Sequence, residues 1–316
     1  MSYRIKTHGR IGAEIQRVAD QEIAAAQTQL RSADRTGATE AIHEARKHFK
    51  KLRALVQLLR EPLGVKGVHA EQVIYRDAGR EFQRLRDAQA LAATLETLAE
   101  RFFETRRPPI VLAARRVLTA EEHRARRALV KNGACDAVLE NLREARLRAA
   151  GWPLDDFRWK ELRAALQRGY RRAREAWRHA CDEPKPRALH DWRRRTKDLL
   201  YHVSLCHSLA PDFMEELAGE LEVLGEFLGD DHDLVVFRSL LERHSRDIPA
   251  GPARDAFFEM LALRREELLD AAFDLAGRVF LDSPGEFIEA LGERRDEHRQ
   301  RRKKAQRIAE RLVVAA

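Results

Sequence analysis

Apolar residues recur at every third or fourth position along most of the chain, which places them on one side of an α-helix. Val and Thr are not gathered into the alternating runs that are typical of strands. The pattern therefore predicts an all-α protein. Gly, Pro and capping residues divide it into successive helices. In the first half of the chain, the predicted helices cover approximately residues 11–30, with a break at Gly37, then a helix that ends near 61–64, and then 70–103. A further helix follows Pro109 and restarts at Thr119, and the next covers 134–150. In the second half, the predicted helices cover approximately 154–180, a helix that includes 188–200, 212–229, 233–244, 253–280 and a last helix that begins at Ser283-Pro284.

Two of these helices share a basic segment. The first copy covers residues 41–53 and the second covers 188–200, and both order an apolar residue, a His, an acid and then several cations. A helix turns about 100° per residue, so the polar residues of each copy share one face. In the first copy this face carries His43, Arg46, Lys47 and Lys50, with Arg53 at its rim. In the second copy it carries His190, Arg193, Arg194, Lys197 and Tyr201.

Each segment also has an apolar side, predicted to face the core, opposite its cationic side. Like charges three or four residues apart repel by a few tenths of a kcal/mol per pair, and the chain has 51 acidic residues with which to alternate them. A solvated surface is the usual meaning of one such face. Two copies in the same register favour a different interpretation, in which an external polyanion supplies the counter-charge.

A second internal match indicates a duplication. Residues 85–91 resemble residues 229–235, with Asp87 opposite Asp231, at nearly the same offset as the two basic segments. Gly151-Trp152-Pro153 is the strongest interruption between the copies. We therefore expect two related helical halves, 1–152 and 153–316, that pack against each other.

Composition narrows the class of partner. The net charge is +8 and the sequence pI is near 9.6, which favours anionic partners. No stretch approaches the roughly 20 apolar residues of a membrane span, and no signal-peptide core follows Met1, so we expect a soluble cytoplasmic protein without a membrane partner. Three widely spaced cysteines are expected to be small core residues: Cys135, Cys181 and Cys206.

The paired His-centred segments, the Asp87 and Asp231 segments and Tyr170-Arg171-Arg172-Ala173-Arg174 together resemble the CHAD family, the conserved histidine α-helical domain, over essentially the whole chain. The resemblance implies two pseudo-symmetric four-helix-bundle halves around a central basic groove or pore. It also implies binding of inorganic polyphosphate and association with polyphosphate granules. The residues expected to contact polyphosphate are His43, Arg46, Lys47, Lys50, Lys51, Arg53, Arg86, Arg163, Arg171, Arg174, His190, Arg193, Arg194, Lys197, Tyr201, Arg301 and Lys304.

We expect neither a metal nor a cofactor. Cations around His43 and His190 would repel a metal ion, so the imidazoles are expected to donate to phosphate oxygens or to hydrogen-bond between helices. Asp87, Asp231 and Asp233 are expected to cap a helix or to orient arginines of the basic face. The nearest string to the ExExK strand of the triphosphatase domains often fused to this family is residues 220–224, which lacks the Lys, and no P-loop is present. The expected function is therefore non-catalytic binding.

Two other functions stay open at this stage. A helical nucleic-acid-binding protein would need a set of Arg, Asn and Gln residues that read bases, and no such set stands out. A metal-dependent phosphohydrolase would need a carboxylate cluster, for which Asp230-Asp231-His232-Asp233 is weak evidence. The sequence does not predict an oligomeric state. Polyphosphate is the expected partner, with other polyanions bound more weakly.

Overall fold

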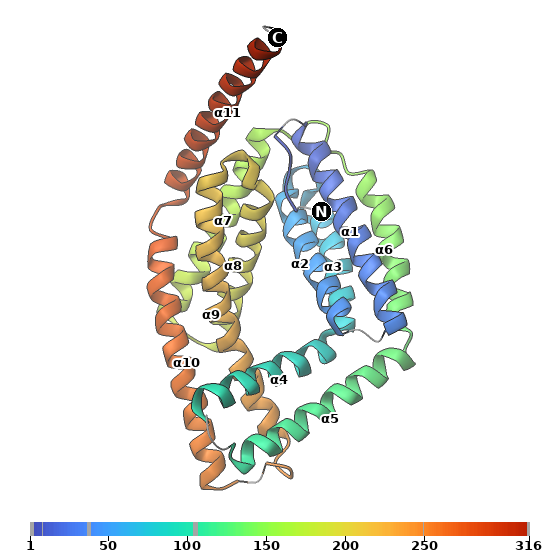
Figure 1. Cartoon of the computed structure of the whole chain (residues 1–316), viewed down its shortest axis with the longest axis vertical. Helices are drawn as coiled ribbons and strands as arrows, with labels where there is room; N and C mark the ends of the chain where they lie inside the picture. Colours follow the sequence, from blue (N-terminus) through green and yellow to red (C-terminus); the bar gives the residue numbers. More distant parts are fainter. Residues whose placement is uncertain (1–2, 8, 37–38, 104–106, 249, 315–316) are drawn as a thin grey trace.

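The computed structural model describes residues 3–7, 9–36, 39–103, 107–248 and 250–314 (Figure 1). Within these ranges all regular structure is helical, as predicted. One short 3-10 helix, His207–Leu209, accompanies the α-helices. The α-helices are α1 Ile11–Thr36, α2 Thr39–Leu58, α3 Arg60–Glu81, α4 Gln83–Phe102, α5 Pro109–Lys131, α6 Ala134–Ala150, α7 Trp159–Asp182, α8 Pro186–Cys206, α9 Pro211–Arg243, α10 Pro252–Val279 and α11 Pro284–Val314.

The helices pack in three groups (Figure 1). A first bundle joins α1, α2, α3 and α6, and a second joins α7 and α8 to α9, with α11 packed on α7. A third group has a separate apolar core, in which α4 and α5 pack with the C-terminal part of α9 and the N-terminal part of α10. The third group takes one helical hairpin from each side of residue 152, so the two halves of the chain share a core. The division at residue 152 and the pseudo-symmetry of the halves stay predictions.

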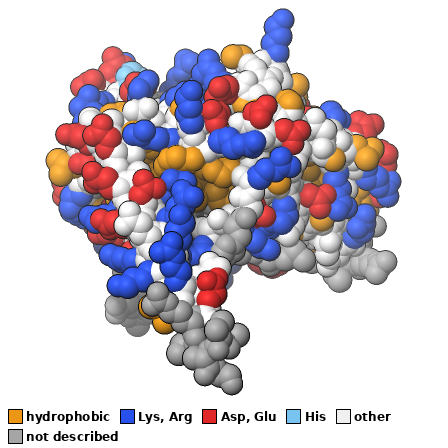
Figure 2. All heavy atoms as spheres, turned by 90° about the horizontal axis from the view of Figure 1, so that it is seen from above, with side chains coloured by type: hydrophobic (Ala, Val, Ile, Leu, Met, Phe, Trp, Pro, Cys, Tyr) orange, Lys and Arg blue, Asp and Glu red, His pale blue; other side chains and the backbone are white. Residues whose placement is uncertain are grey.

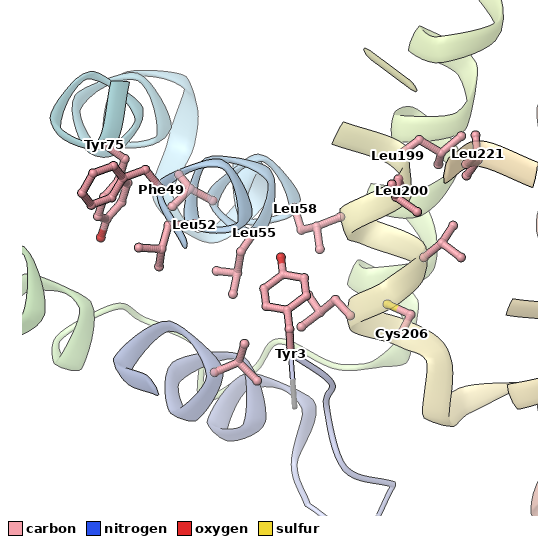
Figure 3. Close-up of a cluster of buried hydrophobic side chains, with 14 of the residues drawn as sticks. Tyr3, Phe49, Leu52, Leu55, Leu58, Tyr75, Leu199, Leu200, Cys206 and Leu221 are labelled. Carbon is pink, nitrogen blue, oxygen red and sulfur yellow. The ribbon is translucent and has the colours of Figure 1, made fainter. Parts of the chain in front are cut away.

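The first two bundles meet where α2 packs against α8. The N-terminal segment fills part of this junction, because Ile5 N–H donates to the Leu205 carbonyl at 2.9 Å. Figure 3 shows Tyr3 between Leu55 and Leu58 of α2 and Cys206 of α8. Apolar burial thus fixes the two motif helices side by side, with their polar faces in a defined relation.

Several helix ends were predicted correctly. Pro109 and Pro284 each begin a helix, and α6 ends at Ala150 immediately before Gly151. The start of α11 is a reciprocal cap, since Ser283 N–H donates to Glu286 Oε2 at 2.7 Å and Glu286 N–H donates to Ser283 Oγ at 3.3 Å.

Other predictions about the helices were wrong. Helix α5 runs through Thr119 and α9 runs through residues 230–233, so neither the predicted restart nor the predicted short helix occurs. The stretch predicted as one helix over 70–103 is broken at Phe82, whose fully buried ring is held by packing and not by a Gly or Pro. Of the cysteines, Cys206 is buried but Cys181 is exposed. The break expected at Gly37 lies outside the described residues.

Candidate functional site

The two basic segments lie on α2 and α8, with the predicted faces. The apolar side of each helix is buried, including Phe49 and Leu52 of α2 and Trp192 and Leu199 of α8. Because these sides anchor the helices in the core, the opposite sides are held toward each other across the junction. Arg86 of α4 completes the arrangement from a third helix.

Lys50 stands at the centre of this arrangement. Its pKa is lowered to about 8, first by desolvation and then by the charge of four nearby cations. These cations are Arg46, Arg193, Arg86 and Lys197. The Lys50 side chain is nevertheless exposed to solvent. Protein atoms and neighbouring charges thus act on this ammonium although water still reaches it. We call Arg46, Lys50, Arg86, Arg193 and Lys197 the central cation cluster.

Most of the central cation cluster has no counter-ion of its own. Across the described parts of the chain, no carboxylate oxygen lies within 4.0 Å of Lys50, Arg86, Arg193 or Lys197. Arg46 donates through Nη1 to the Gly79 carbonyl, but its Nε is buried without a partner, as is the Nε of Arg193. Buried guanidinium donors without acceptors are costly, so these two arginines are held in place at a cost in free energy.

Two glycines of α9 make room for the cations of α8. A Cβ on Gly225 would lie 2.7 Å from Cε and 2.8 Å from Nζ of Lys197. A Cβ on Gly229 would lie 3.4 Å from Nη2 of Arg193. The end of the Lys197 side chain and the guanidinium group of Arg193 therefore lie against bare helix backbone. Sequence reasoning missed these glycines, although their spacing of one helical turn could have identified a close helix approach.

Acidic side chains flank the cluster at longer range. Burial raises the pKa of Asp87 and of Asp233, although Arg86 and Arg193 oppose the shift in both cases. Glu222 and Glu226 of α9, which sequence reasoning also missed, act on Lys197. These acids balance part of the positive charge in the absence of a ligand.

Asp231 orients an arginine, but not one of the basic face. Its carboxylate is almost fully buried and accepts from Arg265 Nε of α10 at 2.7 Å. It orients an arginine, as expected, but that arginine is outside the basic face. Because α9 is continuous here, the alternative of a helix cap is wrong.

The surroundings of the motif histidines lower their pKa values. Desolvation lowers the pKa of His43, helped by Arg86, and lowers the pKa of His190, helped by Arg193. The His190 ring lies 4.9 Å from the ring of His232, whose pKa falls to about 4 for the same reasons. Among the described residues no group of three His, Cys, Asp or Glu side chains could hold a metal ion.

Other predicted contact residues already have partners. Lys47 pairs with Glu44 at 2.6 Å, and Arg194 pairs with Asp191 one turn away. Lys51 points to the other side of α2, where it lies 3.4 Å from buried Glu22 and 5.2 Å from the centre of the Tyr3 ring.

Tyr201 and Arg53 lie nearer the junction. The Tyr201 ring packs edge-on against Tyr3, and burial, with the charge of Asp198 next, raises its pKa to about 12. Arg53 is half-buried with an unpartnered Nε, and desolvation lowers its pKa although Asp198 opposes the shift. Arg53 therefore shares with Arg46 and Arg193 a buried Nε that has no partner, whereas Tyr201 packs in the apolar junction.

The predicted residues of α7 and α11 are not brought to the central cation cluster. Arg163 and Arg171 are exposed on α7, and Arg174 donates through Nε to the Phe280 carbonyl at the end of α10 at 2.9 Å. Arg301 and Lys304 are exposed on α11, whose C-terminal end projects beyond the bundles (Figure 1). Arg301 lies 3.9 Å from Glu297 on its own helix.

The outer surface differs from the cluster in its charge pattern. Figure 2 shows Lys and Arg side chains over one end of the molecule, interleaved with acidic ones around an apolar patch. Positive charge alone therefore does not distinguish the central cation cluster from this face. What distinguishes the central cations is that they have converged without paired carboxylates. No helix in the described parts of the chain is long and apolar enough to cross a membrane.

Comparison with known proteins agrees with this fold. A family model described as "CHAD domain" matches residues 17–242. The crystal structure of the CHAD domain from the plant Ricinus communis superposes with a TM-score of 0.57 at 19% sequence identity, covering 92% of this chain and 96% of that one. No curated protein matches the chain. The family match spans most of the sequence and includes both basic segments, so the chain belongs to the CHAD domain family.

Proposed function

We propose that this protein binds inorganic polyphosphate at the central cation cluster. The observation that carries the proposal is the convergence of four cations from α2, α4 and α8 around Lys50, with no carboxylate within 4.0 Å of any of the five in the described chain. Polyphosphate has closely spaced charges and no bases. It needs only Arg forks that grip two oxygens and Lys point charges, and the cluster supplies both.

The position of the cluster favours a thin, flexible polyanion. The cations around Lys50 come from α2, α4 and α8, so a ligand that contacts them together must reach three helices at once. A single flexible phosphate chain can do so, whereas a DNA duplex carries its phosphates on the outside of a stiff, wide cylinder. We therefore expect DNA and other polyanions to bind more weakly than polyphosphate.

We further propose that bound polyphosphate is not hydrolysed. The acids nearest the cluster, Asp87 and Asp233, lie among Arg86, Arg193 and Lys50. A divalent cation placed there would be repelled by the arginines and the lysine. In the cell, binding without turnover would keep the protein in the cytoplasm on polyphosphate granules.

A binding titration with labelled long-chain polyphosphate at fixed salt tests the proposal. We expect Arg46→Gln and Arg193→Gln each to weaken binding at least tenfold, because a charge-assisted contact contributes about 1.5–3 kcal/mol. Lys47→Gln is the matched control, since Lys47 is exposed and already paired with Glu44. Equal losses in all three variants, or displacement of polyphosphate by duplex DNA at equal phosphate concentration, would refute the assignment. Orthophosphate release with Mg²⁺ that depends on Asp233 would refute the non-catalytic part.

A further inference from the structure

A second group of arginines lies on the far side of α8. Arg195 is two residues from both Arg193 and Lys197, which places it about 160° around the helix from each. Arg172 of α7 lies near Arg195, and it also lies near Arg168 one turn away on α7 and near Arg60 at the start of α3. We call Arg60, Arg168, Arg172 and Arg195 the α7 arginine cluster.

Close packing of α7 against α8 holds this cluster in place. A Cβ on Gly169 would lie 2.8 Å from Nδ1 of His202, so the two helices touch with no side chain between them at this level. His202 in turn contacts the Ala54 carbonyl of α2 through Nε2 at 2.8 Å. Arg168 and Arg172 thus project from a point where three helices are tied together.

The α7 arginine cluster has few acids. In the part of the chain that the structure describes, no carboxylate lies within 4.0 Å of Arg60, Arg168 or Arg172, and Arg195 is 3.8 Å from Asp191. Glu61 and Asp198 act on the cluster from further away, and Asp198 already accepts from Gln57 at 2.8 Å. Desolvation, followed by the charge of neighbouring arginines, lowers the pKa of Arg168 and of Arg172.

We propose that the α7 arginine cluster is a second anion-binding site, separate from the central cation cluster, for a compact ligand with a diphosphate group. Four guanidinium groups and no lysine favour an anion whose adjacent oxygens can be gripped in pairs. Half-buried Arg168, Arg172 and Arg195 with exposed Arg60 would surround a small ligand. The source of the diphosphate is either free pyrophosphate or a nucleoside diphosphate.

Calorimetric titration with pyrophosphate, and separately with ADP, tests the site. Arg168→Gln/Arg172→Gln should weaken binding of the ligand that the wild type binds by at least tenfold, whereas Lys50→Gln/Lys197→Gln should leave it within about twofold. Arg163→Gln/Arg178→Gln is the matched control, because it removes two exposed cations from the same helix. Tighter binding of ADP than of pyrophosphate would identify the nucleotide as the source, and equal or weaker binding the free anion.

Three results would overturn the proposal. They are no binding of either ligand by the wild type, loss of binding in the Lys50/Lys197 variant, and an equal loss in the Arg163/Arg178 control. If Arg168→Gln/Arg172→Gln does not fold by circular dichroism, Arg60→Gln/Arg195→Gln tests the same site from α3 and α8. Long-chain polyphosphate is titrated in parallel, so that failure of polyphosphate binding is distinguished from failure of this site.

Discussion

At the scale of single residues, Lys50 links ligand binding to protonation. Its pKa of about 8 leaves roughly half of the amines neutral at pH 8. A bound polyanion favours the ammonium and raises this pKa, so the complex takes up protons near pH 8. We expect the apparent binding enthalpy at pH 8 to change with the ionisation enthalpy of the buffer. At pH 6 Lys50 is already charged and makes no such contribution.

Lys50→Arg is the control for proton uptake. It keeps the positive charge but cannot titrate near pH 8, so it should bind polyphosphate with a smaller dependence on buffer. A wild-type enthalpy that is the same in phosphate-free buffers of low and high ionisation enthalpy would contradict the prediction.

Gly225 offers a test of how Lys197 is positioned. Gly225→Ala would put a methyl group 2.7 Å from Cε of Lys197, so the flexible end of the lysine must move away from Lys50. Alanine is favoured over glycine in a helix by about 1 kcal/mol, so the variant should keep its stability while polyphosphate affinity falls several-fold. Gly219→Ala on the same helix meets nothing within 4 Å and should gain stability without losing affinity. Wild-type affinity in Gly225→Ala would show that Lys197 needs no such space.

The residue scale also shows what helical spacing can predict. The register of the basic segments correctly placed Arg46, Lys50, Arg193 and Lys197 on a shared face. It could not exclude Lys51, because the acid that pairs with it, Glu22, comes from α1 and not from its own helix. Counter-ions supplied by tertiary packing have no local signature in the sequence.

At the scale of helices, His202 joins α8 to α2 and makes the junction sensitive to acid. Its Nε2–H donates to the Ala54 carbonyl, and its Nδ1 is buried without a partner. Desolvation lowers the pKa of this imidazole in the folded state. Below about pH 6.5 the unfolded chain therefore binds more protons at this histidine than the folded chain does. The free energy of unfolding falls as the pH is lowered through this range. The contribution of His202 to this fall is at most about 1.4 kcal/mol per pH unit.

Urea unfolding at pH 7.5 and pH 5.5 measures this effect. His202→Gln can still donate to Ala54 but cannot be protonated, so its stability should fall less between the two pH values than that of the wild type. His179→Gln, an exposed change on α7, is the control. Identical pH dependence in wild type and His202→Gln would contradict the role assigned to this histidine.

Helix boundaries were predicted where a local signal decides them and missed where packing does. The Ser283–Glu286 cap is entirely local and was found. The capping signal at Thr119 is overridden because α5 is buried on both sides of it, at Val117 and Leu118 in the core of the third group and at Ala125 in the main apolar core. Phe82 ends α3 although residues 80–84 contain no Gly or Pro, because its ring is fully buried.

At the scale of the whole molecule, the halves of the chain are assembled in two ways. Their hairpins share the core of the third group, and their motif helices share the central cation cluster. Internal repetition in the sequence indicated that two halves exist. How they interleave follows from which apolar faces meet, and such long-range pairing is not encoded in the spacing of either copy.

The net charge of +8 raises the question of whether the whole molecule or the central cation cluster attracts polyphosphate. Lys50→Gln/Lys197→Gln and Lys303→Gln/Lys304→Gln remove the same charge from different places, because Lys303 and Lys304 are exposed on α11. Each lost phosphate contact lowers the slope of log affinity against log salt by about 0.7 on a single-stranded polyanion. We expect the central pair to reduce that slope by about 1.4 and the α11 pair to leave it unchanged. Equal reductions in both variants, measured between 50 mM and 300 mM salt, would show that binding follows overall charge and not the cations that converge on Lys50.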